Sequence, residues 1–117
     1  MQEFKMLENL CTFEGVLGAF LIDKNGEILA KFCNEELDFA YVIKIIQCCE
    51  KSGKEIGEAL VGSPLRQSYV EFSDSSLTFD TLKNGNVLAL LAMSGANIGR
   101  IRHEVRKTRK ELEQVMS

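Results

Sequence analysis

The segment Glu36-Leu-Asp-Phe-Ala-Tyr-Val-Ile-Lys-Ile-Ile-Gln-Cys-Cys-Glu-Lys-Ser52 does most to decide the fold. At the 100° steps of an α-helix, its apolar side chains cover an arc of about 220°. A surface helix needs little more than ~100° of apolar arc to cover its own core. The spacing predicts a helix from about residue 36 to residue 52, with a possible continuation to Leu60. Its polar side chains form one stripe: Lys44, Gln47, Lys51, Lys54 and Glu58.

The excess apolar arc of this helix has two explanations. Either the helix is sunk deeply in a core made by its own chain, or a second copy of the protein covers the surplus. The remaining sequence predicts only a short opening helix, at 2–11, and a terminal helix from Asn97. We therefore favour a partner subunit, because these two helices offer little further cover.

Five strands are predicted around this helix. Before it, the apolar run 15–23, the pair Asn25-Gly26 and the alternating run 27–33 indicate a hairpin. After Pro64, the runs 66–72, 76–82 and 87–93 form a meander, with turns at 73–75 and at Asn84-Gly85. Such short connections make neighbouring strands antiparallel. The runs 15–23 and 87–93 are too apolar for strands with one exposed face.

Composition indicates one soluble domain over residues 1–117. The chain is 45% hydrophobic and 26% charged, and no run approaches the ~20 apolar residues of a membrane helix. The first residues lack the features of an export signal, so we expect a cytoplasmic protein without membrane association. Residues 1–99 carry 8 basic and 14 acidic side chains, whereas residues 100–117 carry 6 and 3. This mostly acidic body makes nucleic acid an unlikely main ligand.

No catalytic, cofactor or metal site is expected. Cys11, Cys33, Cys48 and Cys49 form no C-x-x-C pair, and we interpret them as reduced, buried thiols. Catalysis would need Cys48 or Cys49 to pair with His103 and an acid such as Asp80, although burial in an apolar helix keeps a thiol inert. The segments 53–57 and 95–99 lack the context of a phosphate loop. We interpret their glycines as a helix break and a turn.

The order of elements, together with particular residues, resembles the roadblock / dynein light chain family. The matching pieces are Gly15-Val-Leu-Gly-Ala-Phe-Leu-Ile-Asp-Lys-Asn-Gly26, the helix from about Glu36, Asn84-Gly-Asn-Val-Leu-Ala-Leu-Leu91 and Ala96-Asn-Ile-Gly-Arg-Ile-Arg102. The resemblance, to a bacterial or archaeal single-domain member, implies an α+β fold. Its five-stranded antiparallel sheet has the order 2-1-5-4-3, with helices on both faces. The two most apolar strands are then neighbours at the centre.

The resemblance also implies a non-catalytic role. Such proteins pair through the middle helix and the third strand as homo- or heterodimers, and serve as platforms that bind small Ras-like GTPases, regulate their nucleotide cycle or attach cargo. Carried onto this chain, the dimer interface would include Phe39, Tyr41, Ile43, Ile45, Cys48, Ser68 and Val70. The surface that meets the GTPase would include Lys44, Gln47, Lys51 and Lys54.

Two other functions remain open. A small-molecule sensor with a profilin-like or PAS-like core would need an internal cavity. The basic terminal helix would bind an anion or a nucleic acid if its charges form a dedicated surface, and binding would then weaken with salt. A solvated helix face explains the same charges.

Overall fold

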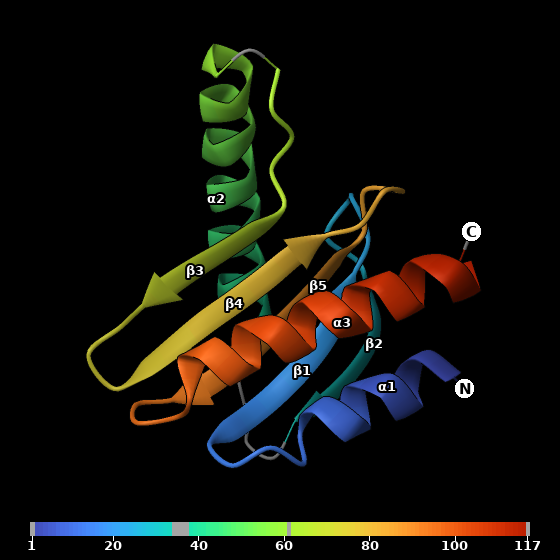
Figure 1. Ribbon diagram of the computed structural model, residues 1–117, viewed down its shortest axis with the longest axis vertical. Helices are drawn as coiled ribbons and strands as arrows, with labels where there is room; N and C mark the ends of the chain where they lie inside the picture. The colour runs from blue at the N-terminus through green and yellow to red at the C-terminus, as the bar shows by residue number, and fades with distance from the viewer. Residues whose placement is uncertain (1, 34–37, 61, 117) are drawn as a thin grey trace.

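The computed structural model describes residues 2–33, 38–60 and 62–116. These residues form three helices and five strands (Figure 1). In chain order the elements are α1 (Gln2–Leu10), β1 (Val16–Ile22), β2 (Ile28–Cys33), α2 (Phe39–Ala59), β3 (Gln67–Glu71), β4 (Ser75–Thr81), β5 (Val87–Met93) and α3 (Ile98–Met116). No helix among the described residues is long and apolar enough to cross a membrane.

The strands form one antiparallel sheet of order β2-β1-β5-β4-β3, which confirms the predicted order. The central strands β1 and β5 pair along nearly their whole length, with Phe20 opposite Ala89. Six of the seven residues in β1 are buried, as its unbroken apolar run predicted. Edge strand β2 is more exposed than β1. Gly26 and Gly85, with φ of +87° and +91°, occupy the left-handed positions that the two Asn-Gly turns require.

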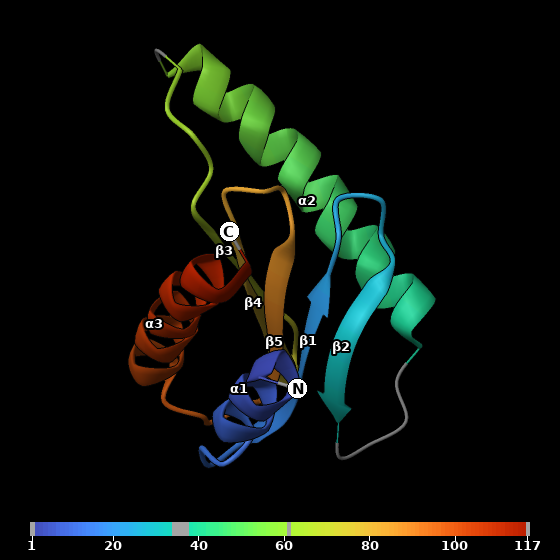
Figure 2. The same ribbon diagram turned by 90° about the vertical axis from the view of Figure 1, so that its right-hand side faces the viewer.

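Helices cover both faces of the sheet: α1 and α3 lie on one face and α2 on the other (Figure 2). Successive residues of β1 alternate between the two cores, because side chains along a strand point to opposite faces. Ala19 and Leu21 join the core under α1 and α3, whereas Phe20 and Ile22 join the core under α2.

Helix α2 begins and ends for identifiable reasons. The carboxylate of Asp38 accepts a hydrogen bond from the backbone N–H of Tyr41, at 3.2 Å, and so caps the first turn. The predicted start near Glu36 falls outside the described residues. At the other end, the helix continues without interruption through Gly53 and Gly57 to Ala59.

The interpretation of Gly53 and Gly57 as a helix break was therefore wrong. Both glycines let the chain after the helix fold back along it. A Cβ atom at Gly57 would overlap the carbonyl oxygen of Ser63, whose N–H donates to the Gly57 carbonyl at 3.0 Å. A Cβ at Gly53 would lie 2.8 Å from the side chain of Leu65. Close packing of this linker thus explains why two residues of low helix propensity occur inside α2.

Candidate functional site

One side of α2 packs against the protein's own sheet. Ile46 is completely buried, and Phe39 and Ile43 pack against the same core cluster. The ring of Phe39 meets Phe20 edge to face, with centroids 5.6 Å apart, and the Nζ of Lys31 lies 4.5 Å from its centre. Phe39 and Ile43, both predicted in a dimer interface, therefore contact their own β-sheet in this structure.

A second side of α2 is apolar and uncovered. At 100° per residue, Tyr41, Ile45, Cys48, Cys49 and Ile56 share one flank of the helix, here called the apolar flank. Tyr41 is 67% exposed and Ile56 is 61% exposed, whereas Ile45 and Cys49 are half-buried against the core. Large apolar side chains that repeat along one exposed flank are typical of an interaction surface.

Edge strand β3 lies on the same side of the molecule as this flank. Gln47, on the opposite flank of α2, lies against the β1–β2 turn, where a Cβ at Gly26 would be 2.8 Å from its Nε2. The apolar flank is therefore on the side of α2 that is turned away from the β1–β2 turn. Figure 1 shows β3 beside α2, at the sheet edge opposite β2. Among the described residues β3 pairs with β4 alone, so its outer edge offers unpaired backbone groups.

Residues of β3 join the apolar flank on the α2 face of the sheet. Ser68 and Val70 stand opposite Phe79 and Leu77, two members of the core under α2, and so point to that face. Of the predicted interface residues, Tyr41, Ile45 and Cys48 are on the apolar flank of α2, and Ser68 and Val70 point to the same face of the sheet. Ile56 and Leu60 are also strongly exposed, and neither was predicted in the interface. Ile56 continues the apolar spacing beyond Gly53, within the part of the helix that was predicted only as a possible continuation.

The predicted polar stripe is exposed and faces two hairpin turns. Lys44, Gln47, Lys51 and Lys54 are all exposed. Lys54 lines a surface cleft of about 400 Å³ together with Arg66 of the linker and Lys83 of the β4–β5 turn. Lys24 of the β1–β2 turn lies beside it, because a Cβ at Gly85 would be 3.4 Å from the Cβ of Lys24.

These contacts gather positive charge from four separate segments. We call Lys24, Lys54, Arg66 and Lys83 the basic end of the molecule. Among the residues that the structure describes, none of these four side chains has a carboxylate within 4.0 Å. In a chain of net charge −3, such a grouping favours an acidic partner surface.

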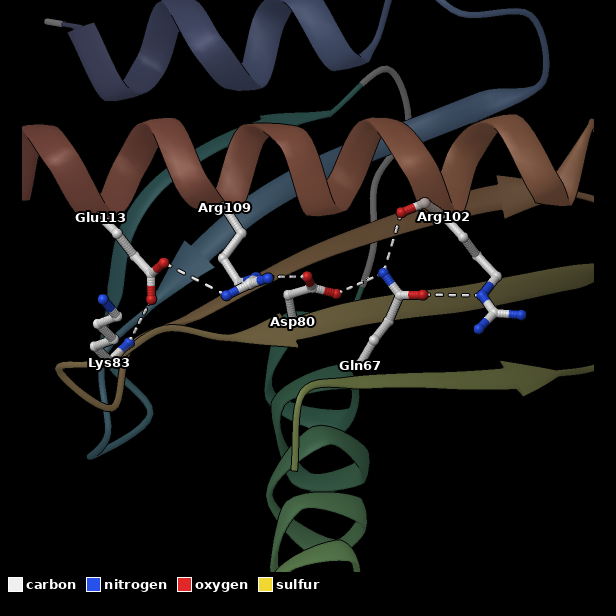
Figure 3. A network of polar contacts seen from close by, with 6 residues as sticks. All are labelled: Gln67, Asp80, Lys83, Arg102, Arg109 and Glu113. Carbon is white, nitrogen blue, oxygen red and sulfur yellow. Dashed lines mark hydrogen bonds and ion pairs between the residues drawn. The ribbon is translucent and has the colours of Figure 1, made fainter. Parts of the chain in front are cut away.

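A polar network fixes α3 and β3 to the sheet (Figure 3). The Nε of Arg109 donates to Oδ2 of Asp80 at 2.9 Å, and Nη1 lies 3.4 Å from Oε1 of Glu113. Gln67, the first residue of β3, donates to Oδ1 of Asp80 at 2.7 Å and accepts from Nε of Arg102 at 2.9 Å. The position of the edge strand therefore depends on contacts with α3.

The same network excludes the catalytic arrangement considered from sequence. Asp80 points to Gln67 and Arg109 on the α3 face of the sheet, whereas Cys48 and Cys49 are on α2 across it (Figure 3). His103 is exposed on α3. Burial raises the pKa of Asp80, and the hydrogen bonds from Gln67 and Arg109 oppose that rise. Asp80 is thus a structural carboxylate.

The cysteines differ from the expectation of buried thiols, since Cys48 is exposed and Cys11, Cys33 and Cys49 are half-buried. Burial, with the neighbouring Cys33, raises the pKa of Cys11 to about 11. Burial and the neighbouring Cys48 also raise the pKa of Cys49. Over the described part of the chain, no three His, Cys, Asp or Glu side chains gather where they could hold a metal ion.

Comparisons with known proteins show what this architecture is. No family model and no curated protein matches the sequence. Among solved structures, Myxococcus xanthus MglB superposes with a TM-score of 0.88 at 15% identity, over 99% of this chain and 95% of that chain. A Roadblock/LC7 domain from Streptomyces avermitilis gives 0.86 at 18% identity, over 97% and 96%. An MglB "with tetrameric arrangement" gives 0.88 at 15%, over 97% and 87%. The expected resemblance is confirmed for the fold: the chain has the architecture of a roadblock/LC7 domain.

Proposed function

We propose that this protein is a non-catalytic, dimeric adaptor that binds a small Ras-like GTPase and modulates its nucleotide cycle or its location in the cytoplasm. The observation that carries the proposal is the apolar flank of α2, which lies exposed beside the open edge of β3. A folded domain gains by covering such a surface, because each buried large apolar side chain contributes about 1.5–3 kcal/mol.

A second copy of the chain would cover both the apolar flank of α2 and the open edge of β3. Two-fold symmetry sets the same patch of each copy against the other. An edge strand can then pair with its own copy, which extends the sheet, while the two apolar flanks pack together. A homodimer would therefore cover the exposed side chains of Tyr41 and Ile56 and pair the open edge of β3 in one interface. The similar MglB structure with a tetrameric arrangement supports self-association of this fold.

The GTPase partner is supported by the fold and by the basic end. Roadblock-like domains, which this chain resembles, serve as GTPase platforms, and MglB shares the architecture. Lys51 and Lys54 continue the exposed stripe of α2 towards Lys83 and Arg66, which offers cations to an acidic protein surface. Such a platform shifts the nucleotide cycle only by binding one state of the GTPase more tightly than the other.

The alternative, a small-molecule sensor, has less support. A sensor needs an enclosed cavity with convergent polar groups. The cleft of about 480 Å³ between Phe13, Met93 and Arg100 is a surface feature with several exposed residues in its lining. Both faces of the sheet are instead filled by fully buried side chains such as Phe20, Phe79 and Leu90.

Affinity capture tests the proposed function. The immobilised protein is exposed to extract from its source cell, once with GDP and once with a non-hydrolysable GTP analogue, and retained proteins are identified by mass spectrometry. The expected result is a Ras-like GTPase that is retained better in one nucleotide state. Equal retention in both states would support a scaffold and remove the switching role. Capture of no GTPase under either condition would contradict the proposal.

A further inference from the structure

Helix α3 carries most of its exposed positive charge along one side. At 100° per residue, five exposed basic side chains fall within an arc of about 140°: Arg102, His103, Arg106, Lys107 and Lys110. The set extends roughly 12 Å along the helix. Between residues 102 and 110, no acidic side chain falls within this arc. We call these five residues the basic stripe of α3.

Two of the three acidic residues of α3 lie on a different side of the helix. Glu104 and Glu111 line a cleft of about 250 Å³ between α3 and α1, and Lys107 borders the same cleft. On the opposite flank, the Nε of Arg102 donates to Oε1 of Gln67, the first residue of β3, at 2.9 Å (Figure 3). The basic stripe therefore lies between the α1 side of the helix, which holds these two acids, and the edge strand β3.

The charges of the basic stripe are not neutralised by nearby carboxylates. Among the residues that the structure describes, none of the five side chains has a carboxylate within 4.0 Å. The third acid of α3, Glu113, is instead paired with Arg109 at 3.4 Å. Arg102, Arg106 and Lys110 follow one another at four-residue spacing, at which like charges destabilise a helix. A helix face that is only solvated commonly mixes both signs of charge, so this arrangement favours a surface that binds an acidic partner.

The chemistry of the stripe and of the whole chain distinguishes among anionic partners. Nucleic-acid-binding domains are typically basic, whereas this chain has a pI of about 5.2, and the stripe has no Phe, Tyr or Trp on which a base could stack. It also has no large apolar side chain to enter a lipid surface, because the apolar side of α3 is buried in the core. A short acidic peptide can contact the stripe alone and so avoid the acidic remainder of the surface. We propose that the basic stripe of α3 binds an acidic segment of a partner protein.

The position of the stripe makes it a second binding surface. Helix α3 lies on the face of the sheet opposite α2, so the stripe is separate from Lys51 and Lys54, which the proposed function assigns to the GTPase (Figure 2). Both surfaces can be occupied at once, as an adaptor requires. The inference depends on neither the homodimer nor the GTPase, because the stripe belongs to a single copy of the chain.

Fluorescence anisotropy with an acidic peptide tests this inference. The full chain is titrated into a fluorescein-labelled peptide of about ten glutamates, at about 50 mM and about 200 mM salt. The natural chain should bind, and its affinity should fall as salt screens the charges. Arg106→Gln combined with Lys110→Gln should weaken binding by roughly fivefold or more. Both positions are exposed, so the variant should remain folded, which circular dichroism checks.

Lys54→Gln combined with Lys83→Gln is the matched control, because it removes the same charge from the basic end of the molecule. The control should change the affinity by less than about twofold. Equal losses in the two double variants would mean that only net charge matters, and would overturn the inference. A natural chain that does not bind the peptide at the lower salt would overturn it as well.

Two other anionic probes test the class of partner. A labelled single-stranded DNA of about ten nucleotides and vesicles that contain phosphatidylserine are compared with the peptide at the same salt concentration. The peptide should bind more tightly than either probe. Tighter binding to the DNA or to the vesicles would overturn the assignment of an acidic protein segment.

Discussion

The Nε of Arg109 lies 2.9 Å from Oδ2 of Asp80, and the two side chains are only 6% and 0% exposed. This buried ion pair joins α3 to β4. Gln67 extends it to the edge strand β3, because its amide donates to the other oxygen of Asp80 and to the backbone carbonyl of Arg102. The network on one face of the sheet therefore holds the strand whose outer edge adjoins the apolar flank on the other face.

Replacement of Arg109 by Met should destabilise the protein strongly. The aliphatic part of the side chain is kept, but the carboxylate of Asp80 remains buried without its cation, which typically costs about 3–5 kcal/mol. Urea unfolding measures the change in the free energy of unfolding. Lys110→Met, at an exposed position on the same helix, is the control and should change stability by less than about 0.5 kcal/mol. Equal effects of both substitutions would show that the ion pair is unimportant.

The loss of stability caused by Arg109→Met should also depend on pH. Burial raises the pKa of Asp80 and Arg109 opposes this rise, so the pKa rises further in the variant. A group whose pKa is higher in the folded state favours folding when protonated, and this contribution is lost as pH rises through the folded-state pKa. The stability gap between the natural chain and the variant should therefore widen from about pH 4 to about pH 7. A gap that narrows over this range would contradict the assignment of Asp80.

Gly57→Ala should destabilise the protein even though alanine is the better helix former. Alanine gains about 1 kcal/mol over glycine inside a helix. The added Cβ would overlap the Ser63 carbonyl oxygen and force the linker away from α2. Thermal unfolding should show a lower midpoint for Gly57→Ala, whereas Ser52→Ala, at an exposed position of the same helix, should keep or raise it. A higher midpoint for Gly57→Ala would mean that the linker does not pack as described.

Reversal of charge at Lys51 and Lys54 should weaken binding of the captured GTPase. If each exposed pair contributes about 0.5–1 kcal/mol, the double Glu variant should lose roughly tenfold in affinity, mainly through slower association. Calorimetry or biolayer interferometry at two salt concentrations measures the loss, which should shrink as salt screens the charges. Lys5→Glu, on α1 at the opposite face of the sheet, is the control and should bind normally. An unchanged affinity in the double variant would place the partner elsewhere.

Local sequence patterns predicted the strands and their turns well, because those signals are local. The two Asn-Gly pairs and the unbroken apolar runs of β1 and β5 each depend on a few neighbouring residues. The length of α2 could not be predicted in the same way. Gly53 and Gly57 have low helix propensity, and what keeps them helical is the linker at Ser63 and Leu65, which folds back in three dimensions.

The orientation of α2 could not be predicted from local sequence patterns either. An apolar arc of about 220° indicates that more than one surface packs against the helix. It does not show which part of the helix faces the sheet. That orientation follows from distant contacts: Phe39 on Phe20, and Gln47 beside Gly26. The basic end likewise joins Lys24, Lys54 and Lys83 from three separate elements, which only the folded topology brings together.

Sedimentation of the reduced protein at micromolar concentration tests the central claim, that the apolar flank of α2 and the β3 edge join two copies. The mass should be twice 13.1 kDa for the natural chain and 13.1 kDa for the variant that combines Tyr41→Asp with Ile45→Asp. Lys44→Asp, a charge change on the exposed polar stripe of the same helix, is the control and should remain a dimer. A natural chain that sediments as a stable monomer would contradict the account.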